Sequence, residues 1–131
     1  MKSLNQKKII YLTKIKKPFL MINSVKKIVP LKSGLGICKI KKNSWFFKSH
    51  FINDPVMPGT LVQESMLQTI VSILYSNKKF KNKICLIIHA NTSFFSKVTT
   101  QNTLNIKVKI KKITKTKIEA FAEVHDSRKI K

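Results

Sequence analysis

The amino-acid sequence predicts an α+β fold in which an antiparallel sheet wraps around one long central helix. Residues 58–75 form a continuous apolar segment with only a narrow polar stripe, which indicates a nearly buried helix. Apolar residues then alternate strictly with polar ones over 104–110 and 118–124, which indicates strands with one face in water and one on a core. A single sheet packed on a single helix is the simplest arrangement that buries both apolar surfaces.

Two further strands are predicted before this helix. Residues 24–29 and 35–42 are rich in Val, Ile and Lys, and Pro30 and Gly34 between them supply the turn residues of a hairpin. Residues 1–16 are basic, and we expect them to form either a short helix or a loosely ordered arm.

The segment after the long helix is less regular. Residues 84–90 form an apolar, strand-like stretch, and beyond residue 126 we expect a last strand that is very short or absent. No repeat, linker or shift in composition divides the chain. We therefore expect residues 1–131 to form one domain, and a hydrophobic content of 43% is sufficient for an ordinary core.

The formal net charge of +22, from 27 basic and 5 acidic residues, predicts anionic partners such as an acidic carrier protein, an anionic membrane or nucleic acid. Abundant Lys, Ile and Asn beside a single arginine, Arg128, are also typical of an AT-rich genome, so many of the lysines need only form a solvated surface. Nucleic acid is the least favoured partner, because the sequence lacks the interleaved aromatic and basic residues of stacking platforms.

The two cysteines predict a reduced, cytoplasmic compartment. Cys38 and Cys85 lie far apart and have neither the spacing of a metal site nor a disulfide framework around them. No apolar run reaches the length of a membrane span or of a signal-peptide core. Since no ligand cluster or glycine-rich phosphate loop is present, the sequence predicts no metal and no organic cofactor.

Residues 45–68 hold the groups that an elimination of water beside a thioester carbonyl requires. His50 can act as the base, and Glu64 can act as the acid because its apolar helix favours a protonated carboxyl group. Gln68 lies one turn later on the same face and can hold that carboxyl group. Gly59, at the helix start, presents a backbone N–H on which a thioester oxygen could dock.

Each of these residues also has a purely structural explanation. A lone histidine between aromatic residues usually serves packing, and this is our interpretation of His89 and His125. Pro58-Gly59 is a common helix start, and Glu64 alone could be a tolerated edge residue. The occurrence of His50, the turn and Glu64 within one short window favours chemistry over packing.

The combination of His50-Phe51, Pro55-Val56-Met57-Pro58-Gly59, and Glu64 followed by Gln68 resembles the signature of the hot-dog-fold β-hydroxyacyl-ACP dehydratases of bacterial-type fatty-acid synthesis. The resemblance implies a hot-dog fold and conversion of a (3R)-hydroxyacyl-ACP to a trans-2-enoyl-ACP. It implies His50 and Glu64 as the catalytic pair, Gly59 as the donor to the thioester and Gln68 as a supporting residue. The residues that it suggests for an acyl tunnel are Met66, Ile70 and Phe94.

The resemblance also bears on partners. The substrate would be carried on the phosphopantetheine arm of an acidic acyl carrier protein, with no further cofactor. In this family the histidine and the carboxylate of one site come from different subunits. The resemblance therefore implies a homodimer with sites at the subunit interface, and assembly into a trimer of dimers stays open.

Several positions depart from the family pattern. Lys14-Ile15-Lys16-Lys17 stands where Pro-His-Arg-Tyr or a similar group is usual, and Ile52-Asn53 replaces Pro-Gly. Asp54 before Pro55 resembles the branch that also isomerises the double bond, whereas Glu64 matches the dehydrating branch. The alternatives are therefore a dehydratase/isomerase, a thioesterase of the same fold, and a degenerate homologue that binds an anionic polymer.

Overall fold

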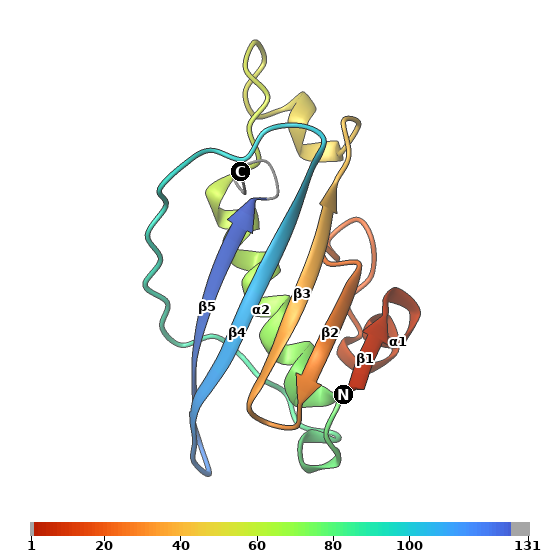
Figure 1. The fold of residues 1–131 in the computed structure, drawn as a ribbon, viewed down its shortest axis with the longest axis vertical. Coiled ribbons are helices and arrows are strands. Elements are labelled where there is room, and N and C mark those ends of the chain that lie inside the picture. Colours follow the sequence, from red (N-terminus) through yellow and green to blue (C-terminus); the bar gives the residue numbers. More distant parts are fainter. Residues whose placement is uncertain (1, 127–131) are drawn as a thin grey trace.

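The computed structural model describes residues 2–126, which form one antiparallel sheet with a long helix against one of its faces (Figure 1). The elements in chain order are β1 (Lys2–Asn5), α1 (Gln6–Thr13), β2 (Ser24–Val29), β3 (Ser33–Ile40), the 3-10 turn η1 (Trp45–Lys48), α2 (Gly59–Tyr75), the 3-10 turn η2 (Lys78–Phe80), β4 (Asn102–Ile113) and β5 (Ile118–Asp126). The sheet order is β1-β2-β3-β4-β5, and each strand is antiparallel to its neighbour. The predicted α+β fold is confirmed.

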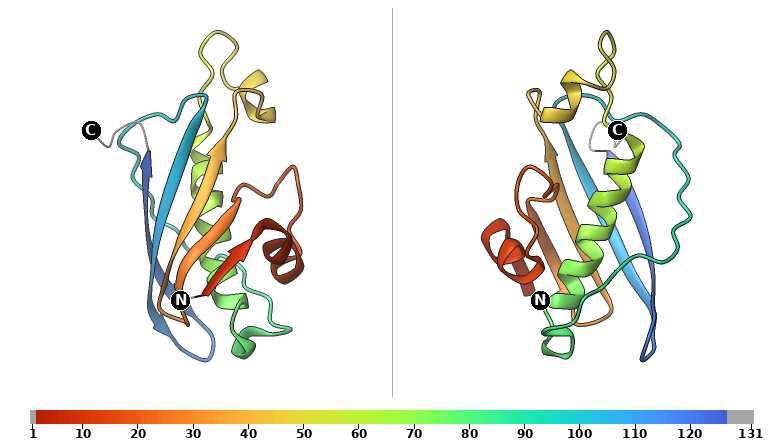
Figure 2. Two further views of the ribbon diagram at one scale, coloured as in Figure 1. Left: turned by 45° about the vertical axis from the view of Figure 1, so that its right-hand side comes forward. Right: turned by 180° about the vertical axis from the view of Figure 1, so that it is seen from behind.

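The core lies between α2 and the inner face of the sheet. Figure 2 shows α2 lying across this face in the view from behind. The strands contribute alternate buried residues, among them Val25 of β2, Cys38 of β3, and Leu104 and Ile106 of β4. The period of two that predicted β4 and β5 therefore separates a core face from a solvent face, as expected.

Small polar side chains let α2 approach the sheet closely. Ser65, Thr69 and Ser72 are fully buried, and each hydroxyl donates to a backbone carbonyl three or four residues earlier, at 2.6–2.8 Å. Because these hydroxyl groups are satisfied within the helix, their burial leaves no unpaired donor against the sheet. Opposite them, Gly36 of β3 leaves its Cα directly beside the Thr69 side chain.

The prediction that Gly34 belongs to the β2–β3 turn is wrong. The turn consists of residues 30–32 and is closed by a hydrogen bond from Lys32 N to Val29 O at 2.9 Å. Gly34 lies inside β3 and pairs with Val108. A Cβ atom there would lie 2.7 Å from Cδ1 of Ile73, so helix packing, and not turn geometry, explains the glycine.

Residues 84–90 do not form the strand that their composition suggested. They belong to an extended segment without regular structure between η2 and β4, which runs along one side of the molecule in Figure 1. Ile84, Leu86 and Ile88 are 83%, 80% and 78% exposed. The apolar composition was recognised correctly, but the described part of the chain supplies no strand to pair with it.

The N-terminal residues are ordered by contacts at the opposite edge of the sheet. β1, which was not predicted, pairs with β2, and Asn5 caps α1 by accepting a hydrogen bond from Lys8 N at 2.9 Å. Ile9 of α1 is fully buried. The expected short or absent last strand after residue 126 lies outside the described residues.

We expect Gly36→Ala to lower the free energy of unfolding by about 1–3 kcal/mol, because the new methyl group would overlap Thr69, whose Cγ2 would lie only 2.7 Å away. Urea denaturation measures the change. In the Gly36→Ala/Thr69→Ala double variant the obstructing atoms are removed, so the second substitution should recover part of the loss. Independent, additive effects of the two substitutions would contradict this account of the packing.

Candidate functional site

His50 lies in the loop that joins η1 to α2, at the end of the molecule where α2 begins (Figure 1). Its Nδ1 atom lies 3.0 Å from the carbonyl oxygen of Val56. A carbonyl only accepts, so Nδ1 must carry the proton, and in the neutral ring Nε2 is left with a lone pair. Because the Val56 carbonyl fixes this tautomer, Nε2 is the ring nitrogen of His50 that can accept a proton.

Backbone hydrogen bonds hold the loop around His50, including one from Val56 N to His50 O at 2.8 Å. Phe51 and Asp54 exchange backbone hydrogen bonds at 3.0 and 3.1 Å, which closes the turn after His50. Met57 N donates to Val98 O at 2.8 Å and attaches the loop to the segment before β4. Asp54 pairs with Lys97 at 3.4 Å, but both side chains are largely exposed, so this pair adds little.

Glu64 is half-buried in the second turn of α2, and Gln68 fixes its carboxyl group. Gln68 is only 1% exposed, and its side-chain amide makes three hydrogen bonds. Nε2 donates to Glu64 Oε2 at 3.0 Å and to Phe19 O at 2.9 Å, and Oε1 accepts from Met21 N at 2.7 Å. The carboxyl group is thereby connected through one amide to the segment that precedes β2.

Gly59 begins α2, and its backbone N–H precedes the first hydrogen bonds of the helix, which Leu61 N and Val62 N make to Pro58 O. Helix geometry leaves such a group without an acceptor in α2 and puts the positive end of the helix dipole behind it. The ring of Phe94 lies against Gly59, where a Cβ atom would be 3.2 Å from Phe94 Cε1. A side chain at position 59 would displace this ring.

A groove of about 1530 Å³ runs along the exposed side of α2, between α1 and the extended segment after η2, and Figure 2 shows these elements on either side of the helix. Glu64 is the first α2 residue in it, followed by Leu67, Gln68, Ile70, Val71, Leu74 and Tyr75. The groove therefore has an apolar floor with one carboxyl group near its beginning. Its rim includes lysines from α1, η2 and the β4–β5 turn.

The structure brings together only some of the predicted site residues. Glu64, Gln68 and Ile70 share the groove, whereas His50, Gly59 and Phe94 do not line it. Within residues 2–126 no hydrogen bond joins His50 to Glu64. Met66 packs against the hydrophobic core outside the groove lining, and its role in a tunnel stays a prediction. Within one chain, the candidate acid Glu64 therefore lies in the groove and the candidate base His50 does not line it.

Sequence reasoning missed the backbone of Phe19 and Met21 as part of the site. The extended turn at Lys17-Pro18-Phe19 was recognised, but its link to α2 was not. A usable signal was present, because a glutamine on a nearly buried helix must find partners for both its amide nitrogen and its oxygen. Only the tertiary structure identifies those partners.

Residues 2–126 contain no group of three or more His, Cys, Asp or Glu side chains placed to hold a metal ion. None of the helices in this part of the chain is long and apolar enough to cross a membrane. Cys38 is buried, which raises the pKa of its thiol to about 12 and keeps it protonated.

Comparisons with known proteins relate the chain to one family. Residues 14–126 match the family described as FabA-like domain. The 3-hydroxyacyl-[acyl-carrier-protein] dehydratase FabZ of Clostridium botulinum (strain Loch Maree) is 32% identical over 97 residues, which are 73% of this chain and 67% of that protein. The FabZ dehydratase of Clostridium novyi (strain NT) is 34% identical over 97 residues, or 73% of this chain and 68% of that protein.

We expect Gln68→Leu to lower the free energy of unfolding by about 2–4 kcal/mol, because it leaves the buried Met21 amide and the part-buried Phe19 carbonyl without partners. Urea denaturation measures this loss. Gln63→Leu, on the same helix but with a half-buried side chain outside this network, is the matched control and should change stability by less than about 0.5 kcal/mol. Equal effects of the two variants would argue against the network.

Proposed function

Because the chain belongs to the FabA-like family, we propose that it is a 3-hydroxyacyl-[acyl-carrier-protein] dehydratase, which converts a (3R)-hydroxyacyl-ACP to a trans-2-enoyl-ACP in fatty-acid synthesis. The observation that carries the proposal is the carboxyl group of Glu64, held by Gln68 at the beginning of an apolar groove. An acyl chain needs such a floor, and loss of a hydroxyl group needs such an acid.

In the proposed reaction His50 Nε2 removes a proton from the α-carbon of the thioester. The electrons of that C–H bond form the double bond as the bond to the β-hydroxyl group breaks. Glu64 donates its proton to this hydroxyl, which leaves as water. Transfer of the proton from His50 to Glu64, directly or through water, restores the starting state.

The Gly59 N–H is proposed to bind the thioester oxygen, where negative charge grows as the α-proton leaves. The dipole of α2, which starts at this residue, supports the same charge. The Gln68 amide acts on Glu64 and does not touch the substrate, so it is a positioning residue. No step needs a metal or an organic cofactor, and the substrate arrives on the phosphopantetheine arm of the carrier protein.

We propose that the working unit is a homodimer with sites at the subunit interface. Two features of the single chain support this: Glu64 lies in a groove that His50 does not line, and the apolar segment at residues 84–88 is largely exposed. The outer edge of β5 has no neighbouring strand among the described residues. A second copy that covers this edge would bury apolar side chains and pair the open strand. Further association into a trimer of dimers is compatible with this arrangement.

We propose a cytoplasmic location. Both cysteines are free, which suits a reducing compartment, and the proposed carrier-bound substrate is that of the FabZ relatives. The alternatives suggested by the sequence are separated by product analysis. A 3-enoyl product would indicate isomerisation, and release of free thiol without an enoyl product would indicate thioester hydrolysis.

Substitution of either catalytic residue should abolish dehydration. We expect His50→Ala and Glu64→Gln each to lower kcat at least ~100-fold with folding unchanged, because each removes one proton transfer. Enoyl formation from 3-hydroxyacyl-ACP, followed by absorbance, measures this. Mixing the two variants should restore about a quarter of the wild-type activity, because half of the dimers are mixed and each has one complete site. Inactive mixtures in which mixed dimers do form would mean that each site uses residues of one chain.

The apolar segment offers a separate test of the dimer. Leu86→Asp/Ile88→Asp would bury two carboxylates in the proposed interface, so we expect monomers in sedimentation equilibrium where the wild type is dimeric. Tyr11→Asp, at an exposed position of α1 beside the opposite edge of the sheet, is the control and should leave the dimer intact. A variant at Leu86 and Ile88 that is as dimeric as the wild type would place the interface elsewhere.

A further inference from the structure

Two aromatic side chains are half-exposed at the backbone segment that binds Gln68. Trp45 of η1 is 49% exposed and Phe19 is 50% exposed. Trp45 Nε1 donates to the carbonyl oxygen of Pro18 at 3.2 Å, so the indole is attached to the residue next to Phe19. Its ring is also fixed edge-on to the buried Phe46, with ring centres 5.6 Å apart. Trp45 is therefore an exposed aromatic side chain in a fixed position.

Exposed lysines are close neighbours of both aromatic residues along the chain. Exposed lysines precede Pro18 (Lys16, Lys17) and flank Trp45 (Lys41, Lys42 and Lys48). Hydrogen bonds between Lys41 and Ser44, at 3.1 and 3.2 Å, close the turn that joins Lys41 and Lys42 to η1, which begins at Trp45. No Asp or Glu precedes Asp54 in the sequence, so both segments come from a stretch without acidic residues. We call the group Lys17, Pro18, Phe19, Lys41, Lys42 and Trp45 the Trp45 surface.

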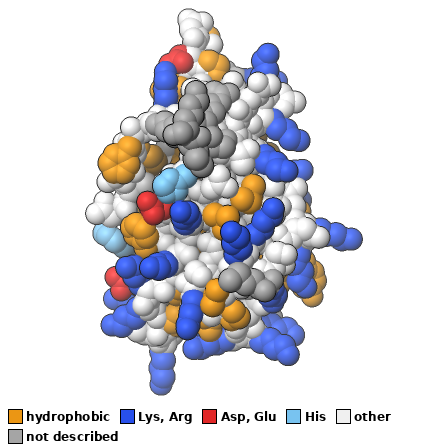
Figure 3. All heavy atoms as spheres, in the orientation of Figure 1, with side chains coloured by type: hydrophobic (Ala, Val, Ile, Leu, Met, Phe, Trp, Pro, Cys, Tyr) orange, Lys and Arg blue, Asp and Glu red, His pale blue; other side chains and the backbone are white. Residues whose placement is uncertain are grey.

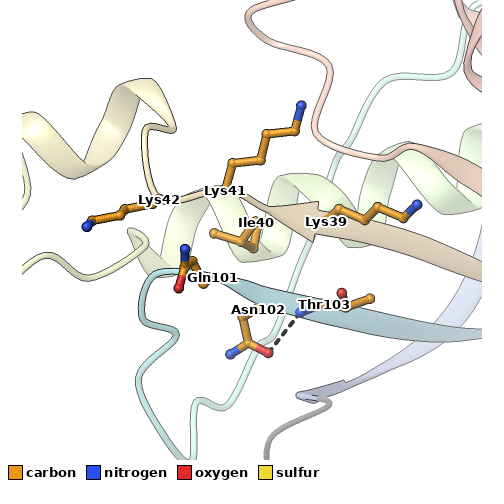
Figure 4. Close-up of a pocket in the computed structure, with 7 residues that line it drawn as sticks. All are labelled: Lys39, Ile40, Lys41, Lys42, Gln101, Asn102 and Thr103. Carbon is orange, nitrogen blue, oxygen red and sulfur yellow. Dashed lines mark hydrogen bonds between the residues drawn. The ribbon is translucent and has the colours of Figure 1, made fainter.

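The shallow pocket beside this surface is not itself an anion site. It has a volume of about 450 Å³ and lies between the end of β3 and the start of β4. Figure 4 shows that the amines of Lys39, Lys41 and Lys42 extend in different directions and do not converge on Gln101 or Asn102. These lysines therefore offer a broad cationic surface for a protein partner and not a cradle for one phosphate group. Lysines are likewise spread over much of the sheet face in Figure 3, where few acidic side chains appear.

The Trp45 surface is connected to the candidate acid by three consecutive contacts. Trp45 bonds to the carbonyl of Pro18, the carbonyl of the next residue, Phe19, accepts from Gln68, and Gln68 donates to Glu64. A partner that binds Trp45 and Phe19 would therefore contact the same backbone segment that positions the carboxyl group. Within the described residues, no other pair of half-exposed aromatic side chains has such a link to Glu64.

We propose that the Trp45 surface is the docking site for the acidic carrier protein that delivers the thioester; this inference rests on the proposed function. An aromatic centre with a charged rim is the usual anatomy of a protein interface, and the rim is complementary to an acidic partner. A single-stranded nucleic acid would instead require successive aromatic side chains along a basic groove. Trp45, packed edge-on to Phe46, does not begin such a series.

The test compares carrier-bound and carrier-free substrates. The variants are Lys41→Glu/Lys42→Glu and Trp45→Ala, and the matched control is Lys107→Glu/Lys109→Glu, which makes the same charge change on exposed residues of β4. KM and kcat are measured with 3-hydroxyacyl-ACP and with the same acyl group on N-acetylcysteamine. For both docking variants we expect KM for the carrier substrate to rise about 10-fold or more. For the Lys41/Lys42 variant kcat/KM for the small thioester should stay within about twofold, and for Trp45→Ala it should fall less than kcat/KM for the carrier substrate.

The control should raise KM for the carrier substrate less than about threefold, the effect of lost long-range attraction alone. An equal rise of the carrier-substrate KM in the control would overturn the proposal, because overall charge would then explain the effect. An equal loss of kcat/KM with the small thioester would also overturn it, because the substituted residues would then have a structural role. The Lys41/Lys42 variant guards against misfolding of the Trp45 variant, because it changes only exposed side chains.

A binding measurement separates this proposal from the proposed reaction. Carrier protein bearing phosphopantetheine is titrated into the wild type and the variants by calorimetry, without turnover. Wild-type protein that dehydrates neither substrate would refute the proposed function, while carrier binding that is lost only in the docking variants would still support the docking site. Binding of an unrelated single-stranded RNA, but not of the carrier, with loss in the docking variants would overturn the proposal.

Discussion

The rest of the structure depends on the side-chain amide of Gln68. It is buried, so its nitrogen and its oxygen both have to be satisfied inside the protein, and they are, by Phe19 O, Met21 N and Glu64. One side chain on α2 thereby holds the segment before β2 and the candidate acid together. Trp45 of η1 donates to the Pro18 carbonyl of the same segment, so this segment links the helix, the candidate acid and the Trp45 surface.

Elements of the fold could be predicted from the sequence where their residue pattern shows which face is buried. Alternation over two-residue steps predicted β4 and β5, and an apolar run with one polar stripe predicted α2, because both patterns report which face is buried. Residues 84–90 gave a strand composition without a partner, and composition cannot say whether an apolar stretch is covered by its own chain. Gly34 was assigned to the turn because turns commonly contain glycine. A sequence does not show whether a glycine is there for turn geometry or because a neighbouring side chain leaves no room for a Cβ atom.

The candidate site was predictable to a similar depth. His50, Gly59, Glu64 and Gln68 were chosen as candidates because their side chains or positions have recognisable chemistry, and their roles stay predictions. Phe19 and Met21 contribute only backbone atoms, which every residue has, and so they give no signal in a sequence. The family resemblance implied that His50 and Glu64 of one chain serve different sites, but the residues alone did not, because proximity in sequence across a loop and a helix start does not set the direction of side chains.

The hydrogen bond between His50 Nδ1 and the Val56 carbonyl has a consequence for the direction of the reaction. Because Nδ1 donates its proton to this carbonyl, every proton that enters or leaves the ring does so at Nε2, on one side of the imidazole. The proposed pair of groups then serves addition of water to an enoyl thioester as well as its removal, by the same path in reverse. Such a site sets how quickly the two acyl forms interconvert but not which of them accumulates. That balance belongs to the reaction that next consumes the double bond.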